Sequence, residues 1–178
     1  YPNLGGTIVS DGTLIACDLN SDPEPRKSSS YDALATVIQR AHDTSDGKQR
    51  FEVWPWLVSF RTGATMRTAH PEWLTQTRDG TVVTGDFDPG HPGVQQQLYN
   101  VCMDIIDHYA VDGLNFDYIR HTSSVNGFNP VSVARYNEIY DKTGIPTDSD
   151  AQFKQWRRDQ ITNVVRKIYL NMIDRKPN

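Results

Sequence analysis

The sequence predicts an α/β fold built from about three parallel βα units. Strand-like segments alternate with segments whose apolar residues recur at helical spacing, in the order β–α–β–long connection–α–β–α–α. The chain has 178 residues, whereas a full eight-unit barrel needs at least ~200. The residues therefore predict either a small doubly wound domain or a segment of a barrel.

Composition excludes several classes of protein. Hydrophobic residues make up 37% and charged residues 22%, which is typical of a globular chain. The net charge of −4 with scattered Lys and Arg argues against a nucleic-acid partner. No apolar run approaches the roughly 20 residues of a membrane span. Neither a GxGxxG nor a P-loop motif is present, so no cofactor is predicted.

The amino-terminal half contains the first predicted elements. Residues 7–18 consist of short apolar runs on the two sides of a turn, which predicts a strand or hairpin. Residues 20–30 are rich in Ser, Asp and Pro and predict a loop. Residues 31–44 carry apolar side chains at helical spacing. Residues 51–59 are strand-like, and Pro55 marks an end of pairing or a bulge because it cannot donate to a ladder.

A long connection opens the carboxyl-terminal half. Residues 60–91 far exceed the usual median of about 5 residues, and Asp79-Gly80 predicts a hairpin excursion within them. Pro92 suits the first turn of a helix at about 92–109. The remaining predicted elements are a strand at 111–118, after a turn at Asp112-Gly113, and helices at about 130–142 and 150–174.

Two cysteines, Cys17 and Cys102, are too few for a disulfide framework. Cys102 lies in an apolar stripe on one face of the predicted helix at 92–109, which favours a buried thiol. The other members of the stripe are Val94, Leu98, Val101, Ile105 and Tyr109.

The richest candidate site is the end of the strand at 111–118. In parallel α/β folds the ligand lies at the carboxyl ends of the strands. Alternation places Leu114, Phe116 and Tyr118 on one face and Asn115 with Asp117 on the other. In a barrel this face is the active one near the strand ends, so we expect Asp117 to point at substrate. The alternative is a structural role, as a cap or as an ion-pair partner of the nearby Arg120.

Aromatic residues gather at the end of the preceding strand. Trp54 and Trp56 are two apart and share a face, with Trp73 further along the chain. Their rings suit the flat C–H faces of sugars, although filling the core is the alternative. Arg61 directly follows the strand and is a candidate to bind hydroxyl groups or a carboxylate, or else an exposed loop cation.

Support for a metal site is thin. The five histidines form no HxxH, HExxH or HxH pattern. Asp117 and His121 are four residues apart, which leaves a metal-dependent hydrolase as a minor alternative.

Four motifs occur in an order that resembles the glycosyl hydrolase-like 10 family of bacteria. They are His70-Pro71-Glu72-Trp73, Asp88-Pro89-Gly90-His91-Pro92, Asp112-Gly113-Leu114-Asn115-Phe116-Asp117-Tyr118-Ile119-Arg120 and Trp156-Arg157-Arg158. The resemblance implies a (β/α)8 TIM-type barrel that cleaves glycosidic bonds, of which 1–178 would be a single partial domain truncated at both ends. It also implies export and, for some members, association with cell-wall glycan.

The resemblance places Asp117 as the carboxylate at the end of the fourth barrel strand and residues 54–61 at the end of the third. His121-Thr122 departs from the Tyr-Pro that the family often has there. We expect Asp117 to act as nucleophile or base, with its acid partner beyond Asn178. Glu52 is the best fallback partner within the chain, ahead of Asp18 and Asp88, because it shares the face of Trp54.

The expected ligand is an oligo- or polysaccharide. The predicted substrate-binding residues are Trp54, Trp56, Arg61, Trp73, Asn115, Tyr118, Arg120 and His121. A carbohydrate-binding barrel without catalysis is the main alternative function.

Overall fold

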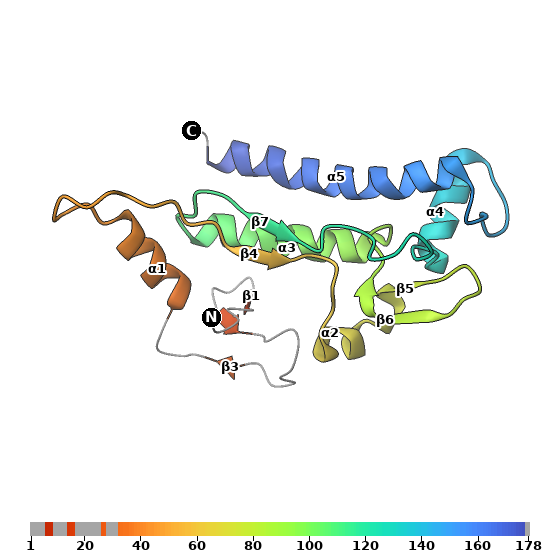
Figure 1. Ribbon diagram of the computed structural model, residues 1–178, viewed down its shortest axis with the longest axis horizontal. Coiled ribbons are helices and arrows are strands. Elements are labelled where there is room, and N and C mark those ends of the chain that lie inside the picture. Colours follow the sequence, from red (N-terminus) through yellow and green to blue (C-terminus); the bar gives the residue numbers. More distant parts are fainter. Residues whose placement is uncertain (1–5, 9–13, 17–25, 28–31, 177–178) are drawn as a thin grey trace.

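The computed structural model describes residues 6–8, 14–16, 26–27 and 32–176 (Figure 1). The first strands, β1 (Gly6–Ile8), β2 (Leu14–Ala16) and β3 (Arg26–Lys27), form one antiparallel sheet. The strands of the hairpin expected at 7–18 are thereby confirmed, and its turn lies outside the described residues. The loop expected at 20–30 is wrong at residues 26–27, which pair with β2. Cys17 and Asp18 also lie outside the description.

Two parallel strands form the part of the fold on which the site depends. In the pair β4 (Trp56–Val58) and β7 (Asn115–Asp117), Trp56 lies opposite Asn115 and Val58 opposite Asp117. The Asn115 N–H donates to the Pro55 carbonyl at 2.9 Å. Proline has no N–H to donate, but its carbonyl can accept a hydrogen bond. The pairing of the two chains therefore includes Pro55, although the regular strand begins only after it. The strand expected at 111–118 is correspondingly shorter.

Helices cover one face of this strand pair. Leu57, Leu114 and Phe116 pack against the cluster formed by α3 (Pro92–His108) and α5 (Ala151–Arg175), which run side by side (Figure 1). Trp56 and Asn115, on the opposite face, are exposed. The predicted alternation therefore holds through Phe116, and it leaves one face of the strand pair open.

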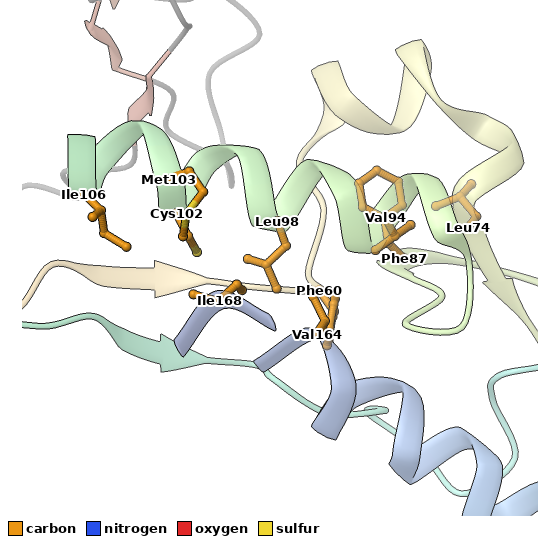
Figure 2. Packing of buried hydrophobic residues seen from close by; sticks show 10 residues of the cluster. All are labelled: Phe60, Leu74, Phe87, Val94, Leu98, Cys102, Met103, Ile106, Val164 and Ile168. Atoms are coloured by element: carbon orange, nitrogen blue, oxygen red, sulfur yellow. The ribbon is translucent and has the colours of Figure 1, made fainter. Parts of the chain in front are cut away.

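Figure 2 shows the main core between α3, α5 and the strands. Its buried members are Phe60, Leu74, Phe87, Val94, Leu98, Cys102, Met103, Ile106, Val164 and Ile168. Cys102 is fully buried, and burial raises the pKa of its thiol to about 12. The predicted stripe of α3 and the buried thiol are thus confirmed.

The long connection after β4 has its own structure. It contains the short helix α2 (Ala64–Ala69), the 3-10 turn η1 (Pro71–Trp73) and the antiparallel strands β5 (Leu74–Gln76) and β6 (Val82–Phe87). Gly80 adopts a φ of 88° in the turn between these strands, a conformation that glycine takes without strain. The hairpin predicted at Asp79-Gly80 is confirmed.

The other helices match their sequence patterns within a few residues. They are α1 (Ala33–His42) and α4 (Pro130–Tyr140), and α5 matches the helix expected at 150–174. Pro92 occupies the first turn of α3, as predicted. None of the helices in the described ranges is long and apolar enough to cross a membrane.

A polar clamp joins α1 to the amino-terminal ends of the two parallel strands. The carboxylate of Asp112 accepts hydrogen bonds from the Val53 N–H at 2.7 Å and from Arg50, and lies 2.8 Å from Nε2 of His42. We call this group the Asp112 clamp. It places α1 beside the strand pair at the end opposite Asp117.

Candidate functional site

The carboxyl-terminal edge of the parallel pair holds Asp117 on the open face. Its side chain is 31% exposed, and its Oδ1 accepts a hydrogen bond from the Tyr118 N–H at 2.7 Å. The Ser59 N–H donates to the Asp117 carbonyl at 2.8 Å, so the backbone of Asp117 is held by the neighbouring strand. Asp117 is neither enclosed in the core nor loose in solvent, which agrees with a ligand-facing carboxylate.

Asp117 also pairs with Arg120, as the structural alternative proposed. The distance from Arg120 Nη1 to Asp117 Oδ1 is 3.8 Å, and the arginine is 61% exposed. An exposed pair with this separation contributes little to stability, at most about 1 kcal/mol. The contact therefore leaves the carboxylate accessible.

Tyr118 departs from the predicted alternation because its backbone turns at the strand end. Its φ is 50°, the left-handed region that a non-glycine residue adopts at a cost of roughly 1–3 kcal/mol. The Tyr118 ring consequently does not join Leu114 and Phe116 in the core. The guanidinium carbons of Arg61 and Arg120 lie 5.1 and 4.9 Å from its centroid, respectively.

Arg61 faces Asp86, a carboxylate that the sequence analysis did not select. The two residues form an antiparallel bridge, and Arg61 Nε lies 3.6 Å from Asp86 Oδ1. Asp86 is only 6% exposed, and its Oδ2 accepts a hydrogen bond from the hydroxyl of Thr122. The sequence offers one signal for Asp86, namely its position near the end of the alternating strand 82–87. This strand belongs to a short hairpin and not to the parallel pair whose ends predict a site.

His121 lies behind this site instead of on its open face. Both ring nitrogens are buried and have no hydrogen-bond partner within the described part of the chain. Burial lowers the pKa of His121 to about 4, helped by the charge of Arg157 and opposed by Asp88 and Asp86. A neutral, enclosed imidazole does not fit the substrate contact expected of His121.

The loop after β7 is braced from α5. Arg157, 7% exposed, donates to the carbonyls of Asn126 and Ser124 and so holds residues 122–127 in place. Its neighbour Trp156 lies in a buried cluster with Tyr136 and Phe153. The Trp156-Arg157 motif is therefore structural in this chain, and it supports the loop that carries Thr122.

The tryptophans divide into two groups. Trp54 and Trp56 are 53% and 56% exposed on the open side of β4, as their spacing predicted. Trp73 instead packs against the main core and stacks on His70 with ring centroids 3.6 Å apart. The expected role of Trp73 in binding substrate is not supported by this position.

The two fallback carboxylates occupy other places. Glu52 accepts a hydrogen bond from Trp54 Nε1 at 2.9 Å. It adjoins Val53, whose carbonyl binds the N–H of Asp112, five residues before Asp117. At about 3.3 Å per residue, Glu52 therefore lies roughly 15–20 Å from Asp117 along the strands, beyond the separation of about 5–9.5 Å between paired glycosidase carboxylates.

Asp88 is fully buried and serves as a structural acceptor. Its Oδ1 accepts from the Gly90 N–H at 2.8 Å, whereas the cap of α3 is supplied by His91, which accepts from Gly93. Asp88 therefore neither caps α3 nor offers the second carboxylate. Within the described residues, no group of three His, Cys, Asp or Glu side chains is placed to hold a metal ion.

The open face of the strand pair thus carries one accessible carboxylate and two guanidinium groups around a tyrosine ring at its carboxyl-terminal edge, and two exposed tryptophans toward its amino-terminal end. Carboxylates and guanidiniums hydrogen-bond to hydroxyl groups, while aromatic rings offer apolar platforms. This combination suits a polyhydroxylated ligand with apolar faces.

Comparison with known proteins agrees with this chemistry. The profile of the glycosyl hydrolase-like 10 family matches residues 15–178. Glycosyl hydrolase DigH from Escherichia coli (strain K12) is 28% identical over 160 residues, covering 83% of this chain and 34% of that protein. Glycosyl hydrolase YngK from Bacillus subtilis (strain 168) is 23% identical over 164 residues, covering 85% of this chain and 29% of that protein. The chain thus spans about a third of the length of these relatives.

A solved structure has a similar fold. Alpha-L-fucosidase isoenzyme 2 from Paenibacillus thiaminolyticus matches with a TM-score of 0.50 over 87% of this chain and 22% of that one, at 14% sequence identity. At this identity the likeness concerns the fold alone.

Proposed function

This chain belongs to the glycosyl hydrolase-like 10 family, and we propose that the protein hydrolyses O-glycosidic bonds in a polysaccharide such as bacterial cell-wall glycan. The proposal includes the architecture: residues 1–178 would be part of a (β/α)8 barrel. The two faces of the β4–β7 pair support this, because barrel strands carry helices on their outer face and ligand-facing side chains at their carboxyl ends.

One observation carries the proposal: β7 ends at Asp117, whose half-buried carboxylate lies on the open face at the edge where barrel enzymes bind substrate. A carboxylate in this position is suited to attack the anomeric carbon or to activate a water molecule. We assign Asp117 one of these two roles.

Glycosidic cleavage also needs a carboxylic acid that protonates the leaving oxygen. Glu52 lies too far from Asp117 for this role, and Asp88 is committed to four structural hydrogen bonds. We therefore propose that the acid comes from another strand of the barrel. The distance between this acid and Asp117 would decide the stereochemical outcome. A separation of about 5–5.5 Å predicts retention, and one of roughly 6.5–9.5 Å predicts inversion.

Substrate contacts follow from the same face. Trp56 lies opposite Asn115, two positions before the Val58–Asp117 pair, so its exposed ring can support a sugar next to the one that is cleaved. Asn115, Arg61 and Arg120 would hydrogen-bond to hydroxyl groups. The ring of Tyr118 adds an apolar surface between the two guanidiniums.

The decisive experiment is Asp117→Asn in the full-length protein. We expect the release of reducing ends from purified bacterial cell-wall glycan to fall by about 10²–10⁴-fold, while glycan binding persists because the amide keeps the shape of the side chain. Asp141→Asn is a matched control, since Asp141 is exposed and its φ of 51° suits asparagine. Turnover retained by Asp117→Asn would contradict the assigned role.

The exposed Trp54 and Trp56 favour one alternative, a carbohydrate-binding protein without catalysis. In that case the wild-type protein would bind the same glycan without releasing reducing ends, and Trp56→Ala would weaken binding. Product formation by the wild-type protein would exclude it.

A cell-wall substrate carries a consequence for location. Because this glycan lies outside the cytoplasmic membrane, we include export of the protein in the proposal. Fractionation of cells that express the full-length protein tests it, with recovery in the cytoplasm as the contrary result.

A further inference from the structure

Arg61 is held on several sides although it lies in an irregular connection. The backbone bridge to Asp86 is flanked by hydrogen bonds from the Phe87 N–H to the Phe60 carbonyl at 2.8 Å and from the Thr62 N–H to the Gly85 carbonyl at 3.1 Å. The guanidinium also lies over Gly85, where a Cβ atom would stand 3.8 Å from its nearest nitrogen. The position of Arg61 is thus set by β6.

Asp86 is the unusual member of this arrangement. A carboxylate that is 6% exposed needs partners, because the removal of a charge from water is costly. Its Oδ2 accepts a hydrogen bond from the Thr122 hydroxyl, but its buried Oδ1 lacks a hydrogen bond from any described residue. Arg61 Nε lies 3.6 Å from Oδ1, so the buried charge acts on this guanidinium, as it also does on the enclosed ring of His121.

Arg61 in turn connects Asp86 to the active edge. Its guanidinium lies over the ring of Tyr118, whose strained backbone directly follows Asp117. Three side chains from three separate segments, and a fourth contributed by Arg120, therefore meet beside the accessible carboxylate. Asp86 itself is too enclosed to contact a sugar.

We propose that Asp86 is a positioning residue: it holds the guanidinium of Arg61 over Tyr118 and thereby fixes the donors that Arg61 offers to the hydroxyl groups of a sugar bound beside Asp117. The role in binding rests on the proposed function, whereas the control of Arg61 by Asp86 does not. Arginine loses considerable rotamer freedom when it binds a ligand, and a partner that orders it beforehand strengthens binding.

A double-mutant cycle in the full-length protein tests the connection. The variants are Asp86→Asn, Arg61→Gln and the double replacement, and the probe is purified bacterial cell-wall glycan. Each single replacement is expected to raise KM about tenfold while kcat changes less than threefold. The double variant is expected to show the same KM as Arg61→Gln alone, because Asp86 acts through Arg61. A KM raised about 100-fold in the double variant would overturn the proposal.

Two further variants separate positioning from a general loss of structure. Asp86→Glu keeps the charge, and we expect it to restore most of the KM lost in Asp86→Asn. Asp88→Asn is the matched control, because Asp88 is equally buried two residues away but bonds only structural groups. It should lower the melting temperature without raising KM. An equal rise of KM in Asp88→Asn would show that any buried change at the end of β6 is sufficient, and would refute the proposal.

A measurement without substrate distinguishes this proposal from the function on which it rests. The Nε–Hε signal of Arg61, assigned by its loss in Arg61→Gln, reports the order of the side chain in ¹⁵N relaxation spectra. We expect an ordered signal in the wild-type protein and a mobile one in Asp86→Asn. If Arg61 is equally ordered in both, Asp86 does not position it. If the signals differ but no glycan is bound or cleaved, the proposed function fails and the role of Asp86 in binding fails with it.

Discussion

Replacement of Asp88 by alanine removes the acceptor that ties together the segments behind the candidate site. Its two oxygens accept from the N–H groups of Gly90 and Asn129 at 2.8 and 3.1 Å and from the hydroxyls of Thr75 and Ser132 at 3.2 and 2.9 Å. These donors belong to β5, to the approach to α3 and to the start of α4. One side chain therefore sets how three elements meet.

The expected loss of stability follows from the donors left behind. The hydroxyls of Thr75 and Ser132 can rotate toward other acceptors, but the two backbone N–H groups cannot. Each buried N–H without a partner costs about 1–3 kcal/mol. The two groups together cost about 2–6 kcal/mol, and water entering the vacated space would offset part of this, so we expect a loss of about 2–5 kcal/mol, a large part of the 5–15 kcal/mol typical of a domain.

Denaturant unfolding monitored by circular dichroism measures this loss directly. Asp79→Ala is the matched control, because Asp79 accepts from Thr77 and Thr81 in an exposed turn where water replaces it, so its loss should change the stability far less than the loss of Asp88. A decrease below about 1 kcal/mol for Asp88→Ala would refute the reasoning, since the four bonds would then carry no net stabilisation.

Three other measurements check the structure. Burial alone would raise the pKa of Asp112, but the donors of the Asp112 clamp outweigh it and lower the pKa below the ordinary value. A carboxyl group of this kind stabilises the fold above its unfolded pKa of about 3.9 and loses that contribution as the pH falls. The stability difference between wild type and Asp112→Asn should therefore be full at pH 7 and shrink below about pH 4; equal differences at pH 7 and pH 3 would contradict it. Because burial raises the pKa of Cys102 to about 12, its thiol in a Cys17→Ala background should react with a disulfide reagent at pH 8 only after unfolding. In Gly113→Ala the new Cβ would stand 2.4 Å from the ring of Trp54, so this exposed ring must move aside and the fluorescence of Trp54 should change; an unchanged spectrum would show that the ring does not rest there.

Much of the fold was predictable because its signals are local. The turn at Asp79-Gly80 needs only a residue that tolerates a positive φ, and the start of α3 needs only a proline whose missing N–H has no partner in the first turn. The buried stripe that contains Cys102 follows from helical periodicity alone. The pairing of Arg26–Lys27 with β2 could not be predicted, since a two-residue strand carries no pattern of its own.

The site was predictable only in part. Alternation along residues 115–117 and 54–56 placed Asp117, Trp54 and Trp56 on the open face. The enclosure of His121 and the packing of Trp73 depend on residues far away in the chain, namely Arg157 and Phe87. Asp86 was missed for the same reason: its partners Arg61 and Thr122 lie 25 and 36 residues away.

By itself the sequence determined most of the strands and helices and which side of α3 and β7 faces the core, because periodicity and turn chemistry act over a few residues. The tertiary structure alone decided which strand ends meet, how Tyr118 turns between two arginines, and that a buried carboxylate stands behind Arg61. Those outcomes depend on contacts between segments that packing brings together, and no local pattern encodes the distance between two such segments.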